Sequence, residues 1–289
     1  MTTAVLEPLA GRRCHTLLNS LHATHFFSPE LAEELAALGV NHPRAVNFAV
    51  RAAALGPVGA GTVTAVFYNY KHELVARHVP AVWEAASPGA VLAARARAVD
   101  ASMRRLLGAD AVVCDAMAEA AELALRATEA CSRPGRPLYA AHADLPVPGE
   151  PHLAYWHATT LLREHRGDGH IATLVAAGLD GLEAVVTHTA TGKGMRPKWV
   201  LATRGWSRDD WDAARERLRE RGLLDAAGEL TAAGVALRAE IETETDRLDR
   251  APYEHLGADG VARLTELARG FAAAAVAAGA FPADLVGKG

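Results

Sequence analysis

The sequence predicts an all-α protein with small β-wings, built as two tandem units that diverged from one ancestral unit. Three observations support this fold class. Long periodic stretches are dominated by alanine, leucine and arginine, which favour helix. Two passages contain similar residues in the same order, at a spacing of about 135 to 141 residues. A helix, a pair of short strands and a second helix are predicted toward the C-terminus. The 289 residues, half of them hydrophobic, are ample for one large or two medium domains.

The repeat is clearest at two His-Ala-Thr triplets, residues 22–24 and 157–159. Each triplet is followed by a helical run with an Ala-Ala pair, by a glycine, and finally by an arginine-bearing helix. We therefore predict a first unit over 1–112, a helix and Pro-rich linker over 113–152, and a second unit over 153–289. Fused copies of one fold commonly pack like a dimer. The interface of such a pseudo-dimer is a natural place for a pocket.

The linker divides into two parts. Residues 113–131 are alanine-rich with an amphipathic pattern and predict a helix. Residues 132–152 predict an ordered connection because they are interrupted by prolines; these are Pro134, Pro137, Pro146, Pro148 and Pro151.

Capping residues predict where the helices of the second unit begin and end. Ser207 and Asp210 have the spacing of a capping box, and the helix that they begin ends near Gly222. Residues 223–231 predict two short strands around a turn, and a long helix follows from Thr231. This order is the tail of a winged helix. In the first unit, the corresponding wing position holds residues 87–89, Ser-Pro-Gly.

Two patterns carry a family resemblance. The segment Leu218-Arg219-Glu220-Arg221-Gly222-Leu223, followed by Leu230-Thr231 and Gly234, resembles winged-helix proteins of the MarR type. A longer pattern is similar to an actinobacterial helix-turn-helix family of largely unassigned function; it comprises residues 161–170, Arg204-Gly205-Trp206, Glu242 and Thr245-Asp246. The MarR-type resemblance covers residues 205–248 and implies a winged-helix unit there. Together with the internal repeat, this predicts two winged-helix-like units packed as a pseudo-dimer. The resemblance also places residues 207–221 at the position of a recognition helix.

A recognition helix must offer cationic or polar side chains to phosphates and base edges. The candidates for contact with double-stranded DNA are Arg204, Ser207, Arg208 and Arg215. Over residues 204–221, however, six arginines face five acidic residues. The alternative interpretation is a solvated helix face laced with i,i+4 ion pairs. The net charge of −4 and pI near 6.4 also argue against a broad basic surface, although they leave room for one local patch.

The densest polar cluster, residues 163–170, lies between two apolar helical stretches. Gly167 and Gly169 predict a tight turn there, and Asp168 predicts the N-cap of the next helix. Three interpretations stay open. The cluster is a buried salt-bridge network that fixes a helix break, a pocket for an anion, or an acid/base site in which Asp168 orients His165 or His170. The candidate catalytic residues are these three; the candidate ligand-binding residues are His22, His157, Arg163, Glu164, His165, Arg166 and His170.

Three histidines at helical spacing, His15, His22 and His25, form a candidate metal or haem site together with His157. The alternative is a set of histidines on a partly buried helix face. No compact metal motif is present, and no cofactor is assigned.

The number and spacing of the cysteines indicate the cellular compartment. Cys14, Cys114 and Cys131 are few, odd in number and widely spaced, which predicts reduced thiols. No signal-peptide pattern is present, and the longest apolar run, residues 271–281, is too short to span a bilayer. We expect a cytoplasmic protein with no membrane partner.

The leading hypothesis is a ligand-responsive DNA-binding regulator with a pocket for a small anionic molecule between its two repeats. The alternative is an enzyme on a winged-helix scaffold, which uses the His/Arg/Asp cluster on a small anionic metabolite with or without metal or haem. A third hypothesis is a protein-interaction module.

Overall fold

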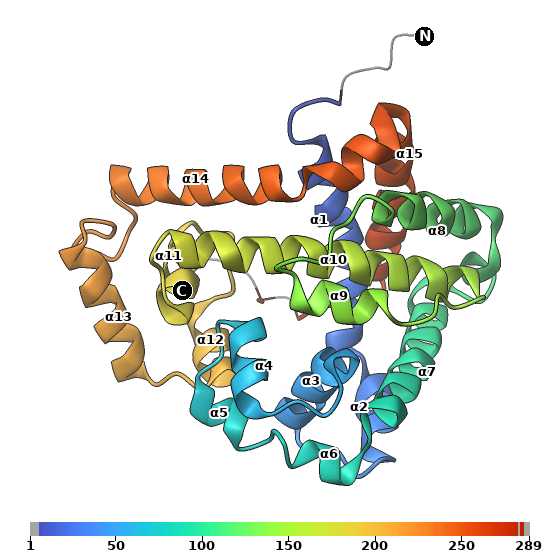
Figure 1. Cartoon of the computed structure of the whole chain (residues 1–289), viewed down its shortest axis with the longest axis horizontal. Helices are drawn as coiled ribbons and strands as arrows, with labels where there is room; N and C mark the ends of the chain where they lie inside the picture. The colour runs from blue at the N-terminus through green and yellow to red at the C-terminus, as the bar shows by residue number, and fades with distance from the viewer. Residues whose placement is uncertain (1–5, 283, 286–289) are drawn as a thin grey trace. The chain divides into compact units, whose positions relative to one another are not determined.

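The computed structural model describes residues 6–282 and 284–285, and these fold into helices joined by short connections (Figure 1). The helices are α1 (Ala10–His22), η1 (Ala23–Phe27), α2 (Pro29–Ala36), α3 (Pro43–Ala52), η2 (Ala53–Leu55), α4 (Ala60–Phe67), α5 (His72–Ala76), α6 (Val82–Ala85), α7 (Pro88–Leu107), η3 (Ala111–Val113), α8 (Asp115–Thr128), α9 (Pro137–Ala143), α10 (Pro151–Ala176), α11 (Gly181–Ala190), α12 (Pro197–Arg204), α13 (Arg208–Glu220), α14 (Ala232–Leu248) and α15 (Arg250–Ala277).

The all-α prediction is confirmed, but the predicted β-wings are wrong. Among the described residues no strand forms, and the wing position holds a single antiparallel bridge between Leu224 and Leu230. The loop between them is closed by its own turn: the Asp225 carboxylate accepts the backbone N–H groups of Ala227 and Glu229, both at 2.9 Å. Two backbone hydrogen bonds flank the bridge, from Asp225 N–H to the Glu229 carbonyl at 2.9 Å and from Thr231 N–H to the Leu223 carbonyl at 3.1 Å. The pairing extends no further because the N–H groups of Leu223 and Leu224 bond to the Leu218 carbonyl of α13. A winged helix with a β-sheet is therefore not present.

The first half has no wing either. Ser87, which the sequence placed in a wing, caps α7 by accepting a hydrogen bond from the backbone N–H of Ala90 at 3.3 Å. Pro88 occupies the first turn, where a missing N–H costs nothing. The segment is a helix start, so the prediction of two tandem winged-helix-like units packed as a pseudo-dimer is wrong.

The chain forms two compact units, each assembled from three segments. Unit 1 comprises Met1–Pro57, Val82–Gly169 and Asp246–Phe281, and unit 2 comprises Val58–Ala81, His170–Thr245 and Pro282–Gly289. Helices α10 and α14 each contribute residues to both units. The division predicted from the sequence, into residues 1–112, 113–152 and 153–289, stays a prediction.

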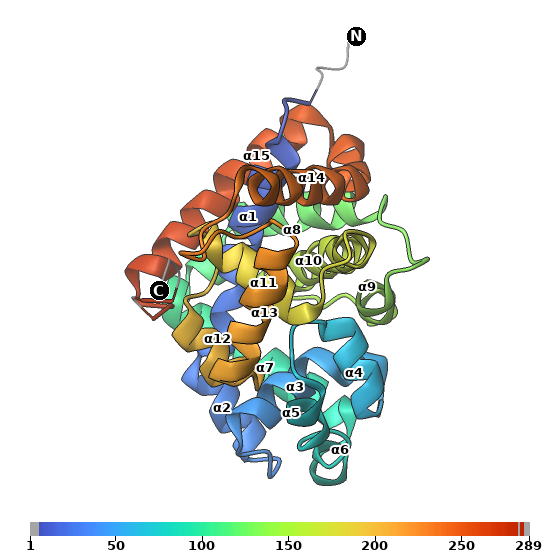
Figure 2. The ribbon, with the colours of Figure 1, turned by 90° about the vertical axis from the view of Figure 1, so that its left-hand side faces the viewer.

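The core of unit 1 forms around α1, α7, α8, α15 and the first part of α10. Helix α1 packs along α15 (Figure 2), and Gly11 allows close contact because a Cβ there would lie 2.7 Å from the Tyr253 ring. The largest fully buried side chains of this core include Leu18, Leu21, Met103, Met117, Tyr155, Leu162 and Tyr253. Burial of such side chains stabilises the unit by roughly 1.5–3 kcal/mol each.

The core of unit 2 forms around α11, α12 and α13. The buried faces of these helices contribute Leu182, Val186, Val200, Trp211, Ala214 and Leu218. The predicted capping box of α13 is confirmed, since Ser207 and Asp210 cap each other's backbone. Gly222 ends the helix with a positive φ of 69°, which glycine adopts without strain.

Within the described residues, no single helix is both long and apolar enough to cross a membrane. Two helix pairs, Pro43–Leu55 with Ala60–Phe67 and Pro151–Ala176 with Gly181–Ala190, reach that length and composition only when each broken pair is counted together.

Candidate nucleic-acid interface and buried polar cluster

Helices α12 and α13 form a helix-turn-helix in unit 2. The connection is residues 205–207, and it begins at Gly205, whose left-handed backbone (φ 82°) ends α12. A Cβ at Gly205 would lie 2.7 Å from the Leu74 side chain, so the turn also needs glycine for close packing. Trp211, Ala214 and Leu218 are buried along one face of α13, which leaves the opposite face exposed. A three-residue turn with glycine between two helices is typical of this motif.

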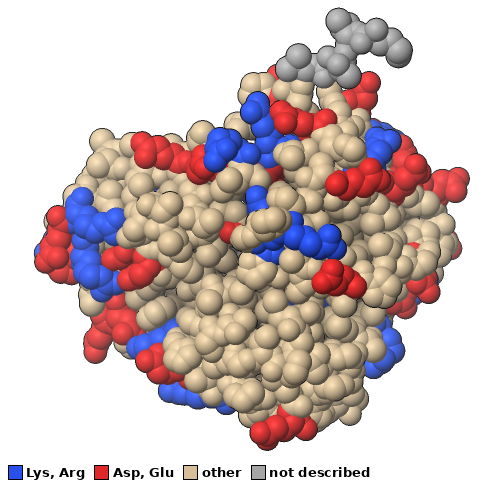
Figure 3. Space-filling model, in the orientation of Figure 1, with Lys and Arg blue, Asp and Glu red and all other residues tan. Residues whose placement is uncertain are grey.

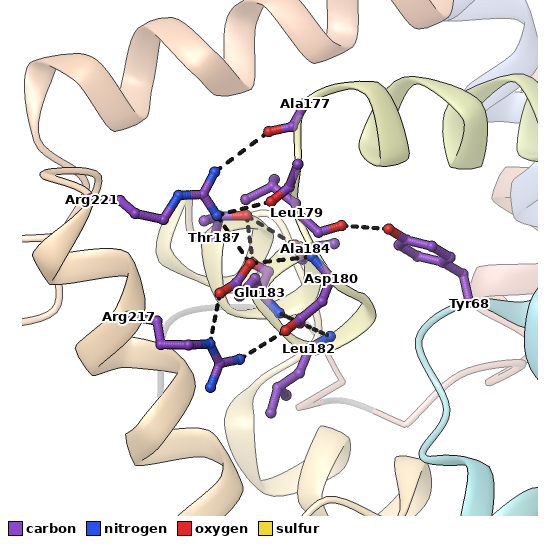
Figure 4. Close-up of polar contacts among 11 residues, drawn as sticks. Tyr68, Ala177, Leu179, Asp180, Leu182, Glu183, Ala184, Thr187, Arg217 and Arg221 are labelled. Carbon is purple, nitrogen blue, oxygen red and sulfur yellow. Dashed lines mark hydrogen bonds and ion pairs between the residues drawn. The ribbon is translucent and has the colours of Figure 1, made fainter.

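Two arginines hold α13 against the start of α11 (Figure 4). The carboxylate of Glu183 is buried and accepts hydrogen bonds from Arg217 Nε at 2.9 Å and Arg221 Nη1 at 3.1 Å. Arg217 also pairs with Asp180 at 2.8 Å, and Arg221 donates to the Gly178 carbonyl at 3.0 Å. These two arginines are therefore used to position α13.

Two of the four predicted DNA-contacting residues have structural roles. The guanidinium of Arg204 stacks on the Tyr70 ring at 4.3 Å and donates to the Tyr70 hydroxyl. The Ser207 hydroxyl accepts a hydrogen bond from the backbone N–H of Asp210 at 3.0 Å. Both residues fix the turn and the start of α13.

The other two predicted residues lie differently. Arg208, in the first turn of α13, is exposed and forms no hydrogen bond or ion pair with the residues that the structure describes. Arg215 donates to the Ala227 carbonyl at 3.1 Å and lies 4.0 Å from Asp212. Arg215 thus ties α13 to the loop that follows it.

The exposed face of α13 carries both signs of charge. Arg219 pairs with Glu216 at 2.6 Å, and Asp209 and Asp212 are exposed nearby. Figure 3 shows lysine and arginine side chains interspersed with acidic ones at the left edge, where Figure 1 places α13. The solvated, ion-paired interpretation describes most charges of this helix; among the described residues, Arg208 is its cation without an ion pair, and Asp209 and Glu220 are unpaired acids.

The polar cluster at residues 163–170 lies inside one helix. Helix α10 continues from Pro151 to Ala176, so the predicted turn at Gly167 and Gly169 is wrong. The physical reason is packing, because a Cβ at Gly169 would lie 2.8 Å from Arg136 Nη1. Arg136 uses that space to donate to the carbonyls of His165 and Leu248. The glycine serves helix packing and not a turn.

Asp168 caps a different helix from the one predicted. Its carboxylate accepts the backbone N–H of Tyr139 at 2.9 Å, in the first turn of α9. Burial raises the pKa of Asp168 to about 6, although this hydrogen bond acts to lower it. Asp168 therefore anchors α9 on α10 and contacts neither of the two histidines that it was predicted to orient.

His165 and His170 have separate partners in the two units. His165 Nδ1 lies 2.9 Å from Asp249 Oδ1, and both side chains are about 2% exposed. Asp249 has its pKa raised by burial, against the opposing effects of His165 and Arg166. His170, in unit 2, bonds the Thr245 hydroxyl at 2.8 Å. His165, Asp168 and His170 are thus each bonded to a different partner and not to one another.

Ion pairs between arginines and acidic residues extend this network in unit 1. Asp246 accepts Arg166 Nη1 at 2.9 Å and Arg12 Nε at 2.9 Å. Arg163 donates to Asn19 at 2.9 Å and to the carboxylate of Glu164. Burial acts to raise the pKa of Glu164, but the surrounding cations lower it overall.

A second buried cluster lies around Trp156 in unit 1. The His22 ring stacks on Trp156 with centroids 4.7 Å apart, and its Nε2 lies 2.9 Å from the Thr160 hydroxyl. His25 Nδ1 donates to the His22 carbonyl at 2.6 Å. Burial lowers the pKa of both histidines, that of His25 to about 3. The candidate residue His157 is buried nearby on α10 and forms no hydrogen bond with the described residues.

The histidines do not build a metal centre in the part of the chain that the structure describes. No group of three or more His, Cys, Asp or Glu side chains there is arranged to hold a metal ion. His15 is separate, with a buried Nδ1 and a pKa lowered to about 3 by burial. The arrangement fits the alternative of buried helix-face histidines.

Sequence reasoning missed Arg95 and His142. Arg95, on α7, donates through Nη1 to the Val50 carbonyl at 2.8 Å and contacts His142 Nε2 at 3.2 Å. His142 Nδ1 in turn donates to the Leu138 carbonyl at 2.8 Å. A signal was present, because Arg95 lies one turn from both Val91 and Val99 on the buried stripe of α7.

Comparison with known proteins identifies the class. A model of a helix-turn-helix family matches residues 11–282, nearly the whole chain. The protein therefore belongs to this helix-turn-helix family. No curated protein matches it, and neither does any solved structure.

Proposed function

We propose that the protein is a DNA-binding regulator that contacts double-stranded DNA through α13 and responds to a small anionic molecule bound in unit 1. The observation that carries the proposal is the α12–α13 helix-turn-helix, packed on one face and exposed on the other, in a chain whose family match covers almost every residue. The MarR-type pattern at residues 218–234 supports the same assignment of α13.

Arg208 is the residue that we expect to contact DNA most directly. It is exposed in the first turn of α13, at the positive end of the helix dipole, which favours phosphate. Arg215 is expected to contribute from the next turns, and Arg204 and Ser207 position the helix. Because most other cations of α13 are paired with acids, few phosphates are neutralised and the affinity is modest.

Paired substitutions test the DNA contact. We expect Arg208→Ala to weaken binding to sheared genomic DNA of the source organism and to reduce the salt dependence by about one phosphate contact. Arg250→Ala is the control, since Arg250 is equally exposed but lies on α15 in an ion pair with Glu254. Equal DNA affinity in wild type and Arg208→Ala would remove α13 from the interface.

Ligand response requires that the small molecule bind the DNA-competent and DNA-incompetent states with different affinity. Helices α10 and α14 run from unit 1 into unit 2 without a break in the chain, which supports communication between a ligand in unit 1 and α13. The candidate ligand residues of unit 1 are His22, His157, Arg163, Glu164, His165 and Arg166, and His170 belongs to unit 2.

The enzyme alternative receives less support from the contacts. His165 is bonded to Asp249, Asp168 caps α9 and His170 is bonded to Thr245, so these three candidate catalytic side chains are each bonded to a different partner among the described residues. A regulator is therefore favoured over catalysis by this cluster.

A further inference from the structure

One arginine of unit 1 is buried without a counter-ion. Arg95 is only 6% exposed, and no carboxylate of the described residues lies within ion-pair distance of it. Glu164 is the acid that acts electrostatically on Arg95, and it is already paired with Arg163. A buried charge without a partner is expensive, so a compensating anion stabilises such a group strongly.

Half of the Arg95 guanidinium is unused. Both hydrogen bonds of the guanidinium, to the Val50 carbonyl and to His142, are made through Nη1. The Nε and Nη2 atoms form no hydrogen bond with the residues that the structure describes. This edge is the one that binds a carboxylate through two parallel hydrogen bonds.

Further unpartnered polar atoms surround the same arginine. The guanidinium lies over the Trp156 ring at 5.2 Å, and the buried Nε1–H of Trp156 has no acceptor. The His22 ring stacks on the same indole, and its buried Nδ1 also has no partner. Buried polar groups are nearly always hydrogen-bonded, so several such groups beside one unpaired cation indicate a polar ligand.

The charge of the cluster selects the kind of ligand. Burial keeps the nearby histidines uncharged at neutral pH, since it lowers the pKa of His142 and of His157 to about 4. Arg163 is paired with Glu164, and Arg51 also acts on that carboxylate. Arg95 therefore contributes one positive charge without an ion-pair partner of its own, which matches a monovalent carboxylate better than a phosphate carrying nearly two negative charges.

We propose that unit 1 binds a small organic carboxylate at the Nε–Nη2 edge of Arg95, with the Trp156 indole N–H as a second donor. This site gives a chemical class to the anionic ligand of the proposed regulator, and its regulatory meaning rests on that function. Arg95 is the residue that binds the carboxylate group of the ligand.

Thermal unfolding of the full chain with benzoate, benzamide and inorganic phosphate tests the site. Benzoate should raise the Tm progressively with concentration, because a ligand that binds only the folded state stabilises it. Benzamide and phosphate should not. Arg95→Met should lose the benzoate shift, whereas Arg97→Met should keep it, since Arg97 lies two residues away on the same helix but is exposed and paired with Glu34.

Arg95→Lys covers the case in which Arg95→Met does not fold. Lysine keeps the charge but loses the two-bond geometry, so the benzoate affinity should fall roughly tenfold or more. No benzoate shift in wild type, an equal shift with benzamide or phosphate, or an unchanged affinity in Arg95→Lys would each overturn the site. DNA binding is measured separately on the same protein, so a failed ligand site with intact DNA binding leaves the regulator's DNA function standing.

Discussion

Glu183 is the residue on which the position of α13 depends most. Its buried carboxylate binds two arginines of the α13 segment and also caps the backbone of Asp180. Glu183→Ala leaves Arg217 and Arg221 without this partner and removes half of a capping box. We expect a loss of about 1–3 kcal/mol in the free energy of unfolding, discounted because both arginines are partly exposed.

Urea denaturation measures this loss, with Glu216→Ala as the matched control. Glu216 pairs with Arg219 on the exposed side of the same helix, so its removal should change stability by less than about 0.5 kcal/mol. Equal losses for the two variants would show that the Glu183 contacts contribute no more than a surface ion pair.

The sequence selected His22, His157, Glu164 and Asp168 as candidate site residues, and all four are buried in unit 1. Their role as a site stays a prediction. The sequence could not select Arg95 as a group facing them, because that contact joins α7 to α10 across more than sixty residues. Asp168 has a good capping side chain, but which helix it caps depends on tertiary packing.

At the scale of elements, substitution of two glycines in α10 tests whether this segment is a continuous helix or the turn that the sequence predicted. Gly167 has open space for a Cβ, with its nearest neighbour, Glu164, at 3.7 Å. Gly167→Ala should therefore stabilise the protein by about 0.5–1 kcal/mol, because alanine is the better helix former. Gly169→Ala should destabilise it by about 1–3 kcal/mol, since the new Cβ collides with Arg136.

Thermal unfolding of the two variants decides between these structures. Opposite shifts in Tm support a continuous α10 in which only Gly169 faces Arg136. A loss of stability in both variants would instead indicate the glycine-dependent turn that the pattern Gly-Asp-Gly suggests.

Helix ends could be predicted where the signal is local. The capping box of Ser207 and Asp210 and the stop at Gly222 both depend on residues within a few positions, and both are present. The wing depended on pairing between short segments, and there the N–H groups of Leu223 and Leu224 bond back to the Leu218 carbonyl of α13, which limits the pairing to one bridge. Long-range choices of this kind are not set by a local pattern.

At the scale of the molecule, buried histidines make stability depend on pH. The pKa values of His15 and His25 fall to about 3, and those of His142 and His157 to about 4, all chiefly because of burial. Below pH 6.5 these histidines take up protons in the unfolded chain but not in the folded one. Stability is therefore greatest above pH 6.5 and falls as the pH decreases toward 4.

The slope can be measured from urea unfolding at a series of pH values. Each such histidine contributes up to about 1.4 kcal/mol per pH unit within the window, and Asp168, with its pKa raised to about 6, opposes them with the reverse slope. The net loss between pH 6 and pH 5 should be about 2–4 kcal/mol. Replacing His142 by glutamine should reduce the slope by about one proton. A free energy of unfolding that stays constant from pH 7 to pH 5 would show that these side chains are not buried in their neutral form.

The central claim is that this helix-turn-helix protein binds DNA through a helix with few free cations. Fluorescence polarisation of the full chain with sheared genomic DNA of its source, over a salt series, tests it most directly. The account predicts binding at low salt that weakens with a slope of log affinity against log salt of roughly −2 to −4, as for two to four phosphate contacts. Absence of binding at the lowest salt would contradict it and would leave the helix-turn-helix as a scaffold for unit 1.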